Sequence, residues 1–106
     1  MGLKFDLSPI WLIEFIYDDY ILKFDPIIKL FPELNETHDL ICLYYNKLGI
    51  DVYGESRMKL IEALISDVDV CWRNYAKEDD EKLTGDAVEL KYRLLAAIKE
   101  IPIGNK

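Results

Sequence analysis

Hydrophobic side chains fill almost every position between Trp11 and Phe24, and only four charged residues interrupt the run. Ser8-Pro9 precedes it, and this pair is typical of a helix N-terminus, where proline fits without losing a hydrogen bond. The pattern predicts a helix over about residues 9–23. Because that helix is apolar on nearly every side, we expect it to lie at the centre of the fold.

The next stretch contains the signals for two shorter helices. Asp25-Pro26 has the same form as Ser8-Pro9 and predicts a second helix, which Pro32 would end. Apolar residues recur at helical spacing over residues 38–48, and Gly49 is typical of a left-handed helix C-terminus. Residues 51–54 read as a loop or a short extended piece. With no second strand expected nearby, a sheet is not predicted.

The second half of the chain gives the clearest helical pattern. Spacings of four and three join Ile61, Ile65, Val68, Trp72 and Tyr75, which predicts a helix over about residues 56–76. A last helix is expected from Thr84 until Pro102.

The predicted fold is therefore all-α: one domain over residues 1–106, built as a compact bundle of about five helices. No linker is long enough to divide the chain. The residues expected at the centre of the core are Trp11, Phe15, Leu64, Trp72 and Leu94.

The charge of the chain limits its partners. It has 106 residues, with 13 basic and 20 acidic side chains and a formal net charge of -7. Nonspecific attraction to nucleic acid is not expected, and a basic partner is the natural complement. The N-terminus lacks the pattern of a signal peptide, and no apolar run is long enough for a membrane span. With Cys42 and Cys71 expected as buried, reduced thiols, these features favour a cytoplasmic protein without a membrane partner.

Candidate catalytic groups are sparse. Glu14 and Asp18 are four residues apart, which places them on one face of a helix, but acid–base catalysis would need another carboxylate with a raised pKa. A metal enzyme using Glu14, Asp18 and Asp86 is a remaining possibility, which a thermal-shift screen with divalent cations would test. His38 is the only histidine and reads as a surface or capping residue. We expect no enzyme activity, no metal site and no cofactor.

Acidic residues and tyrosines form the other candidate group. Seven tyrosines are many for this length, and an exposed tyrosine among carboxylates is typical of an anchor for a partner rich in arginine and lysine. The acidic run before the last predicted helix could be a solubilising connection or an anionic patch. The residues predicted to bind a partner are Tyr17, Asp18, Asp19, Tyr20, Tyr45, Asp67, Asp69, Glu78, Asp79, Asp80 and Glu81.

In size, acidity, tyrosine content and helical pattern, the whole chain resembles the bacterial immunity proteins of contact-dependent growth inhibition systems. The resemblance implies an antitoxin that binds the toxic C-terminal domain of a delivered effector, commonly a basic nuclease, and covers its active site. The alternative is a non-enzymatic helical adaptor or regulatory protein that binds a partner helix in an apolar groove. Salt separates the two, because charge-led binding weakens at high ionic strength and groove binding changes little.

Overall fold

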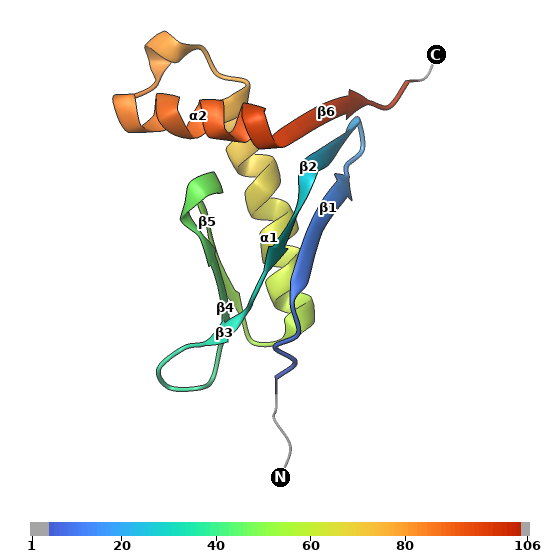
Figure 1. Cartoon of the computed structure of the whole chain (residues 1–106), viewed down its shortest axis with the longest axis vertical. Helices are drawn as coiled ribbons and strands as arrows, with labels where there is room; N and C mark the ends of the chain where they lie inside the picture. Colours follow the sequence, from blue (N-terminus) through green and yellow to red (C-terminus); the bar gives the residue numbers. More distant parts are fainter. Residues whose placement is uncertain (1–4, 105–106) are drawn as a thin grey trace.

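The computed structural model describes residues 5–104 and shows a mixed α/β fold, so the prediction of an all-α bundle of about five helices is wrong. Over those residues the chain forms two antiparallel sheets of three strands each and two α-helices. Figure 1 shows the two sheets side by side, with helix α1 behind them and helix α2 across one end.

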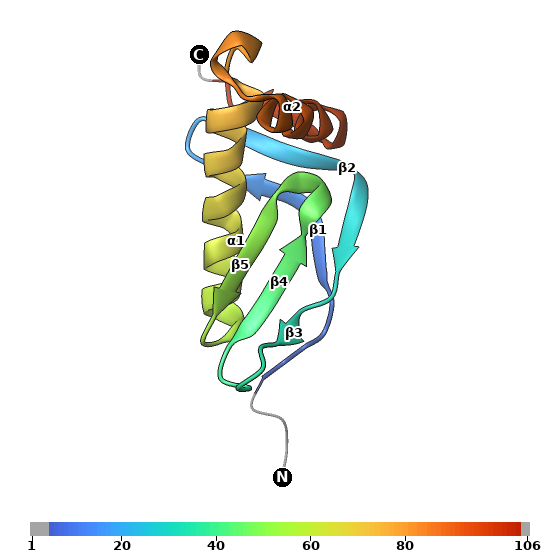
Figure 2. The same cartoon turned by 90° about the vertical axis from the view of Figure 1, so that its left-hand side faces the viewer.

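Sheet A has the strand order β1-β2-β6, and sheet B has the order β3-β4-β5. Strand β2 is the centre of sheet A, and β3 follows it directly at the edge of sheet B, so the chain passes from one sheet into the other (Figure 2). The bounds of the strands are β1 Ile10–Ile16, β2 Tyr20–Leu30, β3 Glu33–Leu34, β4 Ile41–Tyr45, β5 Ile50–Gly54 and β6 Ile98–Pro102.

The two helices lie where the helical spacing was clearest. Helix α1 covers Arg57–Cys71 and continues as a π-helical turn over Trp72–Ala76. Its first turn is capped by the Ser56 hydroxyl, which accepts a hydrogen bond from the Lys59 amide. Helix α2 covers Gly85–Ala97, and Thr84 caps it in the same way. Short 3₁₀ turns occupy Asn46–Leu48 and Asp80–Lys82.

The predicted central helix over residues 9–23 is instead the hairpin of β1 and β2. Its side chains are apolar on both sides, so neither helical nor strand periodicity stands out in the sequence. Aromatic and β-branched residues favour strands, and the hairpin turn lies at Asp18-Asp19. The peptide bond of Asp25-Pro26, read as a second helix start, is cis and lies within β2.

Two further segments that were predicted to be helical contain strands in the structure. Residues 38–48 contain β4 and a single 3₁₀ turn, while residues 51–54 belong to β5 and pair with β4. Gly49 does adopt the expected left-handed conformation, with φ of 69°, but it ends the 3₁₀ turn. The last helix stops at Ala97, and residues 98–102 form β6 against β2. In both cases strand pairing overrides local helical spacing: β4 pairs with its neighbour β5, and β6 pairs with the distant β2.

The core fills the space between the inner faces of the two sheets and α1. Leu64, Trp72 and Leu94 are buried as predicted. Trp11 is 53% exposed on the outer face of sheet A, so its assignment to the core is wrong. Phe15 is half-buried and packs edge-on against Phe24, with ring centroids 5.6 Å apart. Cys42 and Cys71 are free thiols, and Cys42 lies on a strand, not on a helix.

Within residues 5–104, neither helix is both long and apolar enough to cross a lipid bilayer.

Candidate functional site

The predicted partner-binding residues fall into four separate places. The largest group gathers where the β1–β2 hairpin turn meets the end of α1. The Tyr17 hydroxyl donates to the Ile65 carbonyl oxygen at 2.7 Å, and the Tyr20 hydroxyl donates to the Asp69 carboxylate. Tyr20 is buried, so it is not the exposed anchor that was predicted.

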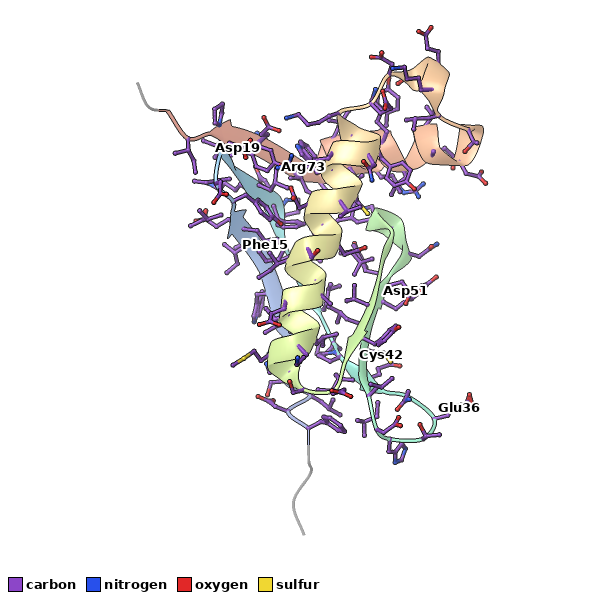
Figure 3. The ribbon with its side chains drawn as sticks, turned by 180° about the vertical axis from the view of Figure 1, so that it is seen from behind. Phe15, Asp19, Glu36, Cys42, Asp51 and Arg73 are labelled. Atoms are coloured by element: carbon purple, nitrogen blue, oxygen red, sulfur yellow. The ribbon has the colours of Figure 1, made fainter. Side chains whose placement is uncertain are left out.

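Arg73 contacts two carboxylates at this place, those of Asp69 and Asp19. Its Nε donates to Asp69 Oδ1 at 3.1 Å, and its Nη2 lies 3.8 Å from Asp19 Oδ1. Figure 3 labels Arg73 and Asp19 at this end of the molecule. Burial, followed by the hydrogen bond to Asp69, raises the pKa of Tyr20 to about 12. Asp69 and Asp19 therefore already have a cation partner within the fold.

The neighbouring strand β6 is joined to α1 by a second polar contact. The Trp72 indole donates from Nε1 to Glu100 Oε1 at 2.7 Å, and Lys77 Nζ lies 2.9 Å from the same oxygen. Together with the Tyr20–Asp69–Arg73 contacts, this network attaches the hairpin and β6 to the C-terminal end of α1. We interpret these residues as structural. Asp18 is exposed at the turn beside them.

The acidic run of residues 78–81 is a connection folded back on α2. Asp80 accepts hydrogen bonds from Lys91 Nζ at 2.7 Å and from the Tyr92 hydroxyl at 2.8 Å, and these contacts lower the pKa of its carboxyl. Glu78 lies 3.9 Å from Lys82. Asp79 and Glu81 are exposed. Two of the four carboxylates are thus already paired.

Tyr45 lies at an apolar cavity of about 580 Å³ beneath α2. The cavity lies between α2, strand β2 and the 3₁₀ turn that follows β4. Its lining residues are Pro26, Ile28, Tyr45, Lys47, Leu48, Val88, Glu89, Tyr92, Arg93, Ala96 and Ala97. Tyr45 therefore contributes to a groove and not to an acidic surface.

The outer face of sheet B carries the exposed tyrosines. Antiparallel register pairs Tyr44 with Asp51, Cys42 with Tyr53 and Glu33 with Cys42. Side chains of paired residues share one face of a sheet, about 5 Å apart. Tyr44 is 66% and Tyr53 is 64% exposed. Figure 3 shows Asp51 and Cys42 on the same outer side of the sheet.

Asp67 lies on α1, which packs against β5, the strand that carries Asp51. Partial burial, with Asp51 as the second cause, raises the pKa of Asp67. Its Oδ2 atom is buried and finds no hydrogen-bond partner among residues 5–104. Over the same residues neither Asp51, Asp67 nor Glu33 forms an ion pair. We call Glu33, Tyr44, Asp51, Tyr53 and Asp67 the tyrosine–carboxylate face.

The chemistry available at this face is that of charge and hydrogen bonding. Burial, and secondarily Asp67, raises the pKa of the nearby Cys71 thiol to about 11, so the thiol is protonated at neutral pH. In the part of the chain that the structure describes, no three His, Cys, Asp or Glu side chains gather as metal ligands. The face can accept hydrogen bonds from cations and offer tyrosine rings for packing.

Only Asp67 of this face was predicted from the sequence. Tyr44, Tyr53, Asp51 and Glu33 were missed because the segments that carry them were read as a helix and a loop. The signal was the alternation of apolar with polar residues in Ile50–Gly54, which predicts a half-buried strand once a partner strand is recognised. The alternation places Asp51 and Tyr53 outward together.

Comparisons with protein-family models, curated proteins and solved structures found no match to this chain. The function is therefore argued from the geometry of the site.

Proposed function

We propose that this protein is an immunity protein that neutralises a basic toxin domain, in the manner of contact-dependent growth inhibition systems, and that the tyrosine–carboxylate face makes the contact. The observation that carries the proposal is the Asp51–Asp67 pair. Two adjacent carboxylates lack an ion pair within residues 5–104, and one has an unsatisfied buried oxygen. An arginine of a partner would place a positive charge and hydrogen-bond donors against the exposed Asp51 carboxylate, and would thereby offset its repulsion with Asp67.

The exposed tyrosines give the same face its apolar contact area. A large, rigid tyrosine side chain loses little conformational entropy on binding, and its hydroxyl remains available for a hydrogen bond. A nuclease must present cations to phosphate, so an acidic face can occupy the region that its substrate would occupy. The net charge of -7 would also accelerate encounter with a basic partner at low salt.

Calorimetric titration against the toxin domain encoded next to this protein tests the proposal. The Tyr44→Ala variant should bind about 30-fold more weakly, as expected when a central aromatic anchor is removed. The double variant Asp51→Asn with Asp67→Asn should weaken binding at low salt by a similar factor and lose much of its salt dependence. Glu36→Gln is the matched control, because Glu36 is also an exposed acid of the sheet B side but lies in the loop between β3 and β4 (Figure 3). Equal weakening by Glu36→Gln, or no binding by the unchanged protein, would contradict the proposal.

The cavity beneath α2 supports a second candidate function, that of an adaptor or regulatory protein which binds a partner helix. Its volume of about 580 Å³ and its mainly apolar lining suit the side chains along one face of an amphipathic helix. Such binding should change little between low and high salt, and Val88→Glu in the cavity wall should abolish it. The tyrosine–carboxylate variants should leave it unchanged.

A further inference from the structure

The cavity beneath α2 exists because that helix covers the fold incompletely. Among its 13 described residues Leu94 alone is buried, and Ala96 and Ala97, which line the cavity, are too small to fill the space below them. The opposite walls come from strand β2, through Ile28, and from the turn after β4, through Leu48. Figure 2 shows α2 next to both segments, at one end of the molecule. A mainly apolar space of about 580 Å³ is within the range of sites that bind small molecules.

The lining of the cavity holds more positive than negative charge, although the whole chain has a net charge of -7. Its charged residues are Lys47, Glu89 and Arg93. Lys47 is exposed and forms no ion pair over residues 5–104. Glu89 lies 3.7 Å from Arg93 Nη1 and is itself exposed, so it offsets only one of the two cations. The cavity therefore combines an apolar lining with an unneutralised positive charge.

Two of the lining side chains are held in place by hydrogen bonds. The Nε atom of Arg93 donates to the Lys47 carbonyl oxygen at 2.6 Å, which joins α2 to the turn after β4. The Tyr92 hydroxyl donates to the Asp80 carboxylate at 2.8 Å, which fixes the tyrosine ring at the cavity. A site whose walls and donors are already ordered loses little conformational entropy when a ligand binds.

We propose that the cavity beneath α2 binds a small amphipathic anion, of the chemical class of a medium-chain fatty acid. The apolar body lies between α2 and β2, and the carboxylate contacts Arg93 and Lys47. A guanidinium can donate to both oxygens of a carboxylate, and Lys47 supplies the charge that no residue of the described fold neutralises. A small inorganic anion would leave the apolar lining unfilled, and an uncharged molecule would leave the lysine unneutralised, so the two features together specify the class of ligand.

This proposal is independent of the toxin contact, which is made by the tyrosine–carboxylate face and is tested with a different partner. Either can fail without affecting the other. Occupation by a small anion would compete with the partner helix of the second candidate function, because both need the same space.

Calorimetric titration with decanoate, kept well below the concentration at which it forms micelles, tests the proposal. We expect saturable binding to one site, and binding of decylammonium that is at least tenfold weaker. The net charge of the protein favours the ammonium, so a preference for the carboxylate reports the cations of the cavity. Absence of saturable decanoate binding, or equal binding of the two probes, would overturn the proposal.

Two pairs of variants locate the site. Ala96→Trp places a large ring in the cavity and should weaken decanoate binding at least tenfold, whereas Leu95→Trp, at an exposed position of α2 outside the lining, should leave it unchanged. Lys47→Glu should weaken binding about fivefold to tenfold. Lys59→Glu makes the same change in net charge in the first turn of α1 and should have no effect.

Far-UV circular dichroism checks that each variant is folded. Because Lys47 and Lys59 are both exposed, the lysine pair remains decisive if the tryptophan variants are unstable. Equal effects within either pair of folded variants would place the ligand elsewhere and would overturn the proposal.

Discussion

Replacing Asp67 by alanine should stabilise this protein, although most substitutions destabilise. Asp67 Oδ2 is buried without a hydrogen-bond partner in the described part of the chain, and Asp51 lies close enough to raise the pKa of its carboxyl further after partial burial has raised it. A buried polar atom left unsatisfied costs about 1–3 kcal/mol. Alanine removes that atom and is a better helix former than aspartate. We expect Asp67→Ala to raise the free energy of unfolding by about 1 kcal/mol, which is about 4–8 °C in Tm for a domain of this size.

The gain in the free energy of unfolding from Asp67→Ala should increase with pH. A carboxyl whose pKa is raised in the folded state contributes its stability below the pKa of the unfolded chain, about 3.9, and loses it as the pH rises. The carboxylate of the unchanged protein therefore disfavours folding at neutral pH. The advantage of Asp67→Ala should be largest near neutrality and should shrink as the pH falls toward about 3.

Asp69→Ala is the matched control, two positions along the same helix. Its carboxylate accepts hydrogen bonds from Tyr20 and Arg73, so its loss leaves a buried hydroxyl unpaired and should lower the free energy of unfolding by about 1–3 kcal/mol. Both values follow from urea unfolding or calorimetry across pH. A lower Tm for Asp67→Ala, or a gain equally large at low pH, would refute the reasoning.

Three further outcomes are expected. Gly54→Ala should lower the free energy of unfolding by about 1–3 kcal/mol in a urea titration, because a Cβ there would lie 2.5 Å from a backbone nitrogen in the first turn of α1; an unchanged midpoint would contradict this contact. The raised pKa of Tyr20, about 12, means that stability is complete below the unfolded tyrosine pKa, about 10, and falls as the pH rises from there toward the folded value. Tyr20→Phe should therefore flatten the fall of Tm in alkaline buffer. Trp72→Phe removes the donor to Glu100 and should cost about 1.5–3 kcal/mol, measured by chemical unfolding.

The sequence predicts the helices of this fold better than its strands, and the reason is visible in the two patterns. Helix α1 presents apolar residues at spacings of three and four with a serine cap, which are local signals. The helix was located correctly, and Val68 and Trp72 of the predicted seam are buried. At the start of the helix the buried residues are Leu60 and Leu64, and not Ile61 and Ile65. Strand β1 is apolar on both sides, and only its pairing with β2 distinguishes it from a buried helix.

The partner-binding residues selected from the sequence and the residues of the tyrosine–carboxylate face share only Asp67. The expectation of exposed tyrosine among carboxylates describes Tyr44 and Asp51, which strand register brings together across β4 and β5. Composition alone cannot show this pairing, because it depends on a sheet that the helical reading excluded. Tyr20 and Asp69 were also predicted to bind a partner because they are a tyrosine and a nearby acid. In the structure the Tyr20 hydroxyl instead donates a hydrogen bond to the Asp69 carboxylate.

The pairing of β6 with β2 also affects how the chain folds as it leaves the ribosome. Phe24 on β2 pairs with Ile98, so one side of that strand has no neighbour until the distant β6 segment has been synthesised. During that interval both outer edges of the nascent β1–β2 hairpin lack a neighbouring strand. The hairpin is rich in aromatic and branched side chains, so it is prone to associate with other chains. Chaperone dependence in the cell should therefore be greatest for chains stalled before residue 98.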